Sequence, residues 1–122
     1  MIELVVAFAG GLGAATRFVV DAQIGRRAPN LGMPLGTVVI NVTGSFLLGV
    51  VVGWWTAHTG DPGLKMVLGT GFMGGYTTFS TASVEAARLA RAGQNLQALL
   101  HAGGMFGVSV VVAGLGIWLG TL

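Results

Sequence analysis

The sequence predicts an all-α membrane protein of four transmembrane helices, the third of which is broken at its centre. The 122 residues are 53% hydrophobic and only 8% charged, whereas a soluble domain carries about 25% charged residues. Four apolar stretches, each close to the roughly 20 residues that cross a bilayer, are separated by short polar loops. No linker or change in composition divides the chain, so residues 1–122 are expected to form a single transmembrane domain.

The first two stretches extend from about Ile2 to Val20 and from about Leu35 to Ala57, and the loop DAQIGRRAPNLGMP joins them. The second stretch places Thr37, Asn41 and Ser45 at four-residue spacing, and therefore on one helix face. A side-chain amide in lipid is costly without hydrogen-bond partners. Asn41 is therefore either an interhelical hydrogen bond that holds the bundle together or a donor that lines a path, and both interpretations stay open.

The third stretch, from about Lys65 to Ala87, contains the segment GFMGGYTTFSTAS, residues 71–83. Glycine in a helix interior costs about 1 kcal/mol relative to alanine, and the hydroxyls that follow compete for backbone groups. We therefore expect this helix to break at Gly74 and Gly75. Irregular backbone at membrane depth is tolerated only where it is buried in protein or lines a cavity, so the break marks the candidate functional site.

The fourth stretch runs from about Leu96 to Leu119 and is rich in glycine, like the whole chain, which has 22 glycines. Small residues at four-residue spacing let transmembrane helices approach closely, and such pairs occur at Gly49/Gly53, Gly103/Gly107 and Gly116/Gly120. These pairs predict a tightly packed bundle. Four closely packed helices leave little room for a conduit, so an oligomer is expected.

The polar residues exclude several classes of protein. The acidic residues are expected at helix ends and in loops, which argues against a proton-coupled carrier with a membrane carboxylate; they are Glu3, Asp21, Asp61 and Glu85. His58 and His101 are expected at the membrane interfaces. Serines and threonines without a base provide no nucleophile, so no catalytic residue is assigned and no enzyme is predicted. The chain has no cysteine for a thiolate metal site and no basic patch for nucleic acid.

Three segments resemble one known family. GGLGAATRF in the first helix, PLGTVVINVTGSFLLG in the second and GTGFMGGYTTFST in the third are similar to the Fluc (CrcB) fluoride channels, over nearly the whole chain. The resemblance implies passive, selective efflux of fluoride ions across the plasma membrane by a multi-pass protein, which lowers cytoplasmic fluoride. It also implies an antiparallel dimer in the lipid bilayer with a structural sodium ion, not transported, at the dimer centre.

The matching motifs imply roles for particular residues. The sodium ion would be held by the backbone carbonyls of Gly74 and Thr77 from both subunits, and Glu85 matches a glutamate that follows the motif. The vestibule would include Arg17 and Thr37. The fluoride path would be lined by side chains of three helices: Asn41, Phe79, Ser80, Thr81, Ser83 and Ser109. Neutral donors and the positive edge of a phenyl ring suit a strongly hydrated anion that must also be released.

Two positions depart from the family pattern. Ala82 stands where the family has a second phenylalanine, and Met105 stands where a tyrosine often precedes the serine. Neither residue therefore receives a role. One alternative is a non-conducting structural half of a heterodimeric fluoride channel. Another is a small multidrug-type exporter, although the carboxylate that such a protein needs in its first helix is absent from AFAGGLGAAT.

The basic residues predict how the chain inserts. One side of the predicted bundle holds all the arginines and the other side only Lys65; the arginines are Arg17, Arg26, Arg27, Arg88 and Arg91. By the positive-inside rule this chain inserts mostly in one orientation, with both termini outside. An antiparallel homodimer must insert both ways. The bias therefore predicts a heterodimer with an oppositely oriented paralogous subunit, and the homodimer is the close alternative.

Overall fold

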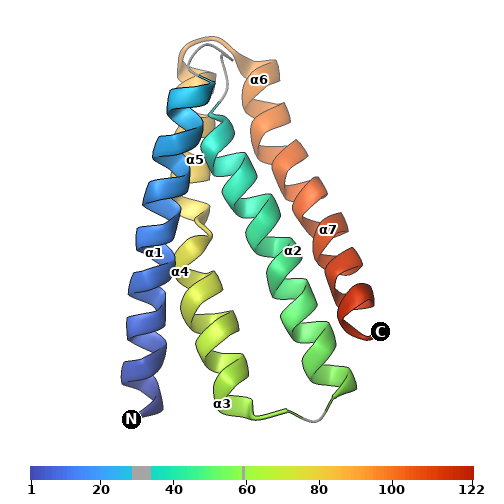
Figure 1. The fold of residues 1–122 in the computed structure, drawn as a ribbon. Helices are drawn as coiled ribbons and strands as arrows, with labels where there is room; N and C mark the ends of the chain where they lie inside the picture. The colour runs from blue at the N-terminus through green and yellow to red at the C-terminus, as the bar shows by residue number, and fades with distance from the viewer. Residues whose placement is uncertain (29–33, 59) are drawn as a thin grey trace.

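The computed structural model describes residues 1–28, 34–58 and 60–122, and these residues form helices and no strand. Four helical paths lie side by side along the long axis, with both termini toward the same end (Figure 1). The four-helix, all-α prediction is therefore confirmed. In chain order the elements are α1 (Ile2–Arg27), α2 (Leu35–Ala57), α3 (Pro62–Lys65), the π-helix η1 (Met66–Met73), α4 (Gly74–Tyr76), α5 (Phe79–Arg91), α6 (Asn95–Leu99), the π-helix η2 (Leu100–Gly104) and α7 (Met105–Gly120).

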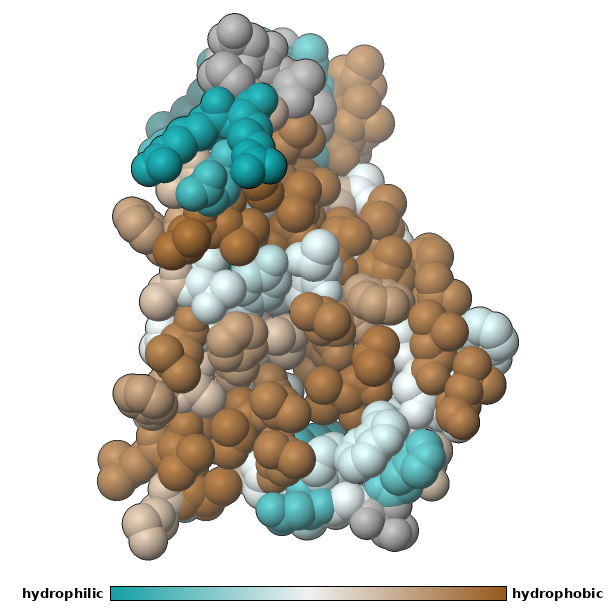
Figure 2. All heavy atoms as spheres, viewed as in Figure 1, coloured by the Kyte–Doolittle hydropathy of each residue, from teal (hydrophilic) through white to brown (hydrophobic). Residues whose placement is uncertain are grey.

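Three helices are long and apolar enough to cross a membrane, namely α1, α2 and the continuous run Asn95–Gly120. The remaining path consists of α3, η1 and α4, followed by α5 after an interruption, so no single helix of that path has the required length. The chain is therefore a multi-pass membrane protein. The surface agrees, because hydrophobic residues cover the middle of the molecule and hydrophilic residues gather toward its ends (Figure 2).

The helix bounds agree with the sequence prediction at α2 and exceed it elsewhere. α1 continues beyond Val20 to Arg27, and α5 continues beyond Ala87 to Arg91. These extensions are rich in alanine, arginine and leucine, which favour helix, and water can solvate a helix end that leaves the bilayer. The predicted loops therefore shorten. Residues 29–33 of the first loop and residue 59 of the second lie outside the described residues.

Glycines hold α2 against α7 through backbone contact. A methyl group at Gly49 would collide with the carbonyl oxygen of Ala113, and one at Gly53 with that of Ile117. The contact is reciprocal, because Gly116 and Gly120 press on the backbone of α2 in the same way. The predicted packing role is therefore confirmed for two of the three pairs. In the third pair, a Cβ atom at Gly103 would meet only Leu99, at 3.9 Å, and one at Gly107 would meet no atom of the described residues within 4 Å.

A second glycine contact holds α1 against the third path. A Cβ atom at Gly13 would collide with the carbonyl oxygen of Phe72, and one at Gly75 with that of Gly10. At Gly71 the Cβ would lie 2.9 Å from the carbonyl oxygen of Val6. α2 in turn contacts α7 and α1, and Asn41 of α2 reaches the backbone of the third path at Thr78.

Candidate functional site at the interruption of the third helix

The third helical path is interrupted at Thr77 and Thr78. Both residues have extended backbone angles, with φ −79° and ψ 158° at Thr77 and φ −148° and ψ 120° at Thr78. The sequence analysis placed the break at Gly74 and Gly75, but both of these residues are helical. That position is corrected. Gly75 serves close packing against α1 instead, and the chain leaves the helix where hydroxyl side chains compete for backbone hydrogen bonds.

The amide of Asn41 replaces the missing helical hydrogen bonds. Its Oδ1 accepts from the backbone N–H of Thr78 at 2.8 Å, and its Nδ2 donates to the carbonyl of Thr78 at 2.9 Å. Nδ2 also lies 3.4 Å from the sulfur of Met105. Asn41 therefore makes interhelical hydrogen bonds, as the first of its two interpretations predicted. Its second N–H is held only by a thioether, which is a weak acceptor that another acceptor can replace.

The hydroxyl of Thr78 starts α5. It accepts from the backbone N–H of Thr81 at 3.3 Å and lies 3.1 Å from the hydroxyl of Thr81 and 3.4 Å from that of Ser80. Threonine is a favoured N-cap residue because it satisfies one of the free N–H groups of the first turn. The N-terminus of a helix also carries a partial positive charge. Three hydroxyls and a positive helix end are therefore gathered at the interruption.

The two carbonyl groups assigned to sodium lose their helical donors. In a continuous helix the N–H of Thr78 would donate to the carbonyl of Gly74, but it donates to Asn41. The N–H of Thr81, which would donate to the carbonyl of Thr77, donates to the hydroxyl of Thr78. The carbonyls of Gly74 and Thr77 therefore fit a hard cation, because unwound membrane helices coordinate sodium through such oxygens.

A cavity of about 290 Å³ lies between α2, α5 and α7 beside the interruption. Asn41, Ser83 and Ser109 line it together with Phe79, Ala82 and Met105. The hydroxyl oxygen of Ser109 is buried and has no hydrogen-bond partner among the described residues. The ring of Phe79 is 88% exposed and lies at the edge of the cavity on the subunit surface. The structure thus brings four of the six residues assigned to the fluoride path to one cavity, whereas Ser80 and Thr81 lie exposed in the first turn of α5 and do not line it.

The residues assigned to the vestibule do not form one group. Thr37 is buried, and its hydroxyl donates to Oε1 of Glu85 at 2.8 Å. Arg17 is half-buried on α1 and forms no hydrogen bond or ion pair with the described part of the chain. His101, expected at an interface, is fully buried, with Nε2 3.1 Å from Oε2 of Glu85. That expectation is corrected, because η2 turns His101 toward α5 and into the bundle.

Sequence reasoning missed the contact between Glu85 and His101, and also the hydrogen bond between Thr43 and Tyr76, whose hydroxyls lie 3.0 Å apart. A separation of 16 residues across a loop carries no periodic signal. The available signal was the shared face of Thr37 and Asn41 on α2, because polar groups on one buried face need partners on the opposing helices.

Comparison with known proteins supplies the family. The model of the family described as "CrcB-like protein, Camphor Resistance (CrcB)" matches residues 4–121. A protein of Leifsonia xyli subsp. xyli named fluoride-specific ion channel FluC 1 is 53% identical over 122 residues, covering 100% of this chain and 88% of the relative.

Two further relatives carry similar names. Fluoride-specific ion channel FluC 2 of Cutibacterium acnes is 49% identical, with 99% of this chain and 98% of the relative covered. Fluoride-specific ion channel FluC of Novosphingobium aromaticivorans is 43% identical, with 94% and 89% covered. These relatives are channels and not enzymes, and in bacteria such multi-pass proteins lie in the cell membrane. The resemblance found in the sequence is therefore confirmed, and the chain belongs to the CrcB-like family.

Proposed function

We propose that this chain forms a passive channel selective for fluoride, whose efflux lowers the fluoride concentration in the cytoplasm. The observation that carries the proposal is the set of neutral donors beside the interruption of the third helix. Asn41 offers an N–H held only by a sulfur atom, and Ser109 offers a buried hydroxyl without a partner into the same cavity. The names of the relatives support fluoride as the permeant ion.

The chemistry of these groups suits fluoride. A small anion that binds water strongly enters a membrane only where donors replace its hydration. The amide of Asn41 and the hydroxyls of Ser80, Thr81, Ser83 and Ser109 supply such donors, and the N-terminus of α5 adds a partial positive charge. None of the described residues that line the cavity is charged, so binding stays weak enough for release. The absence of a carboxylate from the cavity lining also favours passive flux over exchange for protons.

A second subunit completes the path in this proposal. The ring of Phe79 is 88% exposed and borders the cavity on the outer face of the subunit. A phenyl ring presents a positive edge to an anion, but a ring on a lipid-facing surface encloses no conduit. An antiparallel partner packed on this face would cover Phe79 and Ser83, and it would bring the two interrupted helices together.

A structural sodium ion fits the interruption. The carbonyls of Gly74 and Thr77 would hold it, because the N–H groups that would occupy them in a continuous helix donate elsewhere. The ion would supply a fixed positive charge within the dimer. Gly74→Val tests this role, because a Cβ atom at Gly74 meets only the carbonyl of Gly69, at 4.0 Å. The variant subunit is expected to fold but to lose sodium-dependent dimer stability. Gly114→Val, whose Cβ atom would meet no atom of the described residues within 4 Å, is expected to keep that stability.

Fluoride efflux from proteoliposomes tests the function. Vesicles loaded with potassium fluoride and containing this chain are expected to release fluoride, followed with a fluoride electrode, when valinomycin balances the charge. Vesicles loaded with chloride are expected to retain it. Adding a protonophore is expected to leave the fluoride rate unchanged. A rate that collapses when the proton gradient is removed would contradict the channel and favour an exporter of the small multidrug type.

A heterodimer with an oppositely oriented paralogue is the second candidate. Ala82 and Met105, which stand where the family has aromatic residues, both line the cavity. A C-terminal reporter active only in the cytoplasm and another active only outside test the orientation. One-sided signal together with no efflux from this chain alone supports the heterodimer, whereas equal signal with full efflux supports the homodimer.

A further inference from the structure

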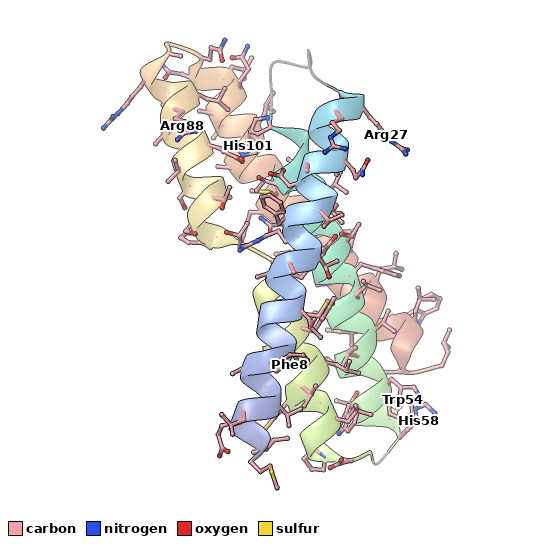
Figure 3. The ribbon with its side chains drawn as sticks, turned by 60° about the vertical axis from the view of Figure 1, so that its left-hand side comes forward. Phe8, Arg27, Trp54, His58, Arg88 and His101 are labelled. Carbon is pink, nitrogen blue, oxygen red and sulfur yellow. The ribbon has the colours of Figure 1, made fainter. Side chains whose placement is uncertain are left out.

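Four exposed arginines lie at one end of the bundle, in the last turns of two helices. Arg26 and Arg27 belong to the last turn of α1, and Arg88 and Arg91 belong to the last turn of α5. Figure 3 shows Arg27 and Arg88 at the same end of the molecule. None of the four forms an ion pair with the described part of the chain. Their guanidinium groups are therefore free to bind a partner outside the subunit.

The two carboxyl groups at this end of the bundle have other neighbours. The carboxyl group of Glu85 accepts a hydrogen bond from Thr37, and that of Asp21 packs against Gly36 at the start of α2. The remaining two acidic residues of the chain lie in the first turn of α1 and directly before α3, at the opposite end (Figure 1). The subunit itself therefore leaves the charge of the four arginines to be balanced from outside.

The helix dipole alone does not account for this distribution. Cations are favoured at the C-terminus of any helix, yet the last turns of α2 and α7 carry no basic residue. These two helices finish toward the opposite end of the bundle (Figure 1), with Trp54 and Trp55 in the last turn of α2 and Trp118 in that of α7. Tryptophan is common at membrane interfaces and carries no charge. The arginines are therefore specific to one end of the molecule and are not a feature of helix ends in general.

The length of α1 places the arginines at the depth of the lipid headgroups. α1 has 26 residues and is therefore about 39 Å long, whereas the hydrocarbon core of a bilayer is about 30 Å thick. The part of α1 that extends beyond the core is its polar end, because its apolar stretch stops at about Val20. The last turn of α1, with Arg26 and Arg27, therefore lies at the depth of the lipid phosphates, and the last turn of α5 lies at the same end.

The exposed face of α5 combines apolar and basic residues. Val84 is 49% exposed and precedes Arg88 by four residues, and the exposed Ala87 precedes Arg91 by four residues. Residues at this spacing share a helix face, so the face is apolar near the middle of α5 and basic at its end. Such a face suits a lipid, whose acyl chain lies along the apolar part and whose headgroup meets the arginines.

We propose that the four arginines form a binding surface for the headgroups of anionic phospholipids in one leaflet of the membrane. Guanidinium groups bind phosphate through paired hydrogen bonds, and clusters of basic residues next to membrane helices attract anionic lipids. The apolar face beside Arg88 and Arg91 favours a lipid over a soluble phosphate ester, which has no acyl chain to place there. The surface is separate from the proposed fluoride path, so its ligand does not depend on which ion the channel passes.

Thermal unfolding of the purified chain in a neutral detergent tests the proposal. A lipid that binds only the folded state raises the unfolding midpoint, so a titration gives the mole fraction of lipid at half-maximal stabilisation. Phosphatidylglycerol is expected to raise the midpoint, whereas phosphatidylcholine, which has no net charge, is expected to raise it much less. Glycerol 3-phosphate, the soluble form of the same phosphate ester, is expected to have little effect. A shift as large with glycerol 3-phosphate as with phosphatidylglycerol would overturn the lipid as the ligand.

The chain offers a matched control, because Lys65 is also exposed and basic but lies at the opposite end of the bundle. Each basic residue near an anionic membrane surface strengthens binding roughly fivefold. Arg88→Gln is therefore expected to raise the half-maximal mole fraction of phosphatidylglycerol roughly fivefold, and Arg88→Gln combined with Arg91→Gln roughly 25-fold. Lys65→Gln is expected to leave it unchanged. Equal changes in Arg88→Gln and Lys65→Gln would show that only net charge matters and would overturn the proposed surface.

A salt titration tests the same surface in the unmodified protein, and therefore needs no variant to fold. Raising the salt concentration from about 0.1 M to about 1 M shortens the Debye length from roughly 10 Å to roughly 3 Å. The stabilisation by phosphatidylglycerol is expected to weaken severalfold over this range, because the exposed arginines are accessible to salt ions. Stabilisation that is the same at both salt concentrations would show that the headgroup charge is not recognised, and would overturn the proposal.

Discussion

The α2–α7 contact and the Thr77–Thr78 interruption both lie against α2, and they satisfy the backbone in opposite ways. Along α7, both helices stay intact, and glycine lets their backbones touch, as at Gly53 and Gly116. At the interruption the third helix gives up its own hydrogen bonds, and the side chain of Asn41 replaces them. One contact depends on the absence of side chains, and the other depends on one amide.

This difference indicates that the α2–α7 contact contributes to stability and that the interruption contributes to transport. At the α2–α7 contact the glycines bring backbone against backbone and contribute no side-chain donor or acceptor. The interruption instead leaves the carbonyls of Gly74 and Thr77, the second N–H of Asn41 and the hydroxyl of Ser109 without strong hydrogen-bond partners, and in the proposed channel these groups bind ions. Substitutions in the first region are therefore expected to act on folding, and substitutions in the second to act on transport.

The largest effect is expected for Gly53→Val. The new side chain would collide with the backbone of Ile117, and overpacking of this kind costs about 1–3 kcal/mol or more. The variant should therefore lose folded protein and, with it, all fluoride flux. Thermal unfolding in detergent measures the change. Gly107→Val is the matched control, because Gly107 meets no atom within 4 Å, and its midpoint should stay near that of the unmodified protein.

The sequence predicted the helices and the α2–α7 contact because both depend on local patterns. Apolar length fixed α2 at Leu35–Ala57, and four-residue spacing identified Gly49/Gly53 and Gly116/Gly120. The same pattern misassigned Gly103/Gly107, since spacing alone does not say which face meets a neighbour. Similarly, Gly75 is a poor helix former in isolation, but its contact with Gly10 keeps it helical and moves the break to Thr77 and Thr78.

The sequence predicted which residues form the site, but it did not predict which hydrogen bonds some of these residues make. The matching positions on the second, third and fourth helices identified Asn41, Phe79 and Ser109, and the structure gathers these residues around one cavity. The partners of Thr37 could not be predicted, because they come from α5 and η2, whose mutual orientation depends on tertiary packing. The burial of His101 has the same origin: its position near a helix end predicted an interface, but the wide turn of η2 directs it inward.

Asn41→Leu should have the next largest effect, on flux more than on folding. Leucine leaves the N–H and C=O of Thr78 without their partner, and an unsatisfied buried group costs about 1–3 kcal/mol. Flux falls further because the Nδ2 donor is lost: a hydrogen bond to a charged group is worth about 1.5–3 kcal/mol, which corresponds to roughly tenfold or more in fluoride efflux. Asn41→Asp is the informative companion, since it keeps the acceptor for Thr78 but loses the donor. Normal flux in Asn41→Leu would leave Asn41 with a packing role only.

Thr78→Val should have a smaller effect, because it removes the cap of α5 and leaves the Asn41 hydrogen bonds in place. Loss of an N-cap hydroxyl costs about 1 kcal/mol, and the N–H of Thr81 loses its acceptor. The unfolding midpoint and the flux should both fall modestly, whereas Thr78→Ser should restore them. A valine variant as stable and as active as the serine variant would mean that the N-terminus of α5 needs no side-chain cap.

Ser109→Ala should have the smallest effect on stability and is the sharpest test of the division between the two regions. The serine hydroxyl is buried without a partner in the described structure, so its removal takes away an unsatisfied group and should leave the unfolding midpoint unchanged or slightly raised. If the hydroxyl serves only packing, fluoride flux should also stay unchanged. If the hydroxyl donates a hydrogen bond to a permeating anion, fluoride flux should fall severalfold in the alanine variant and recover in Ser109→Thr. A protein that gains stability and loses transport through one oxygen atom would show that this polar group is kept for the ion and not for the fold.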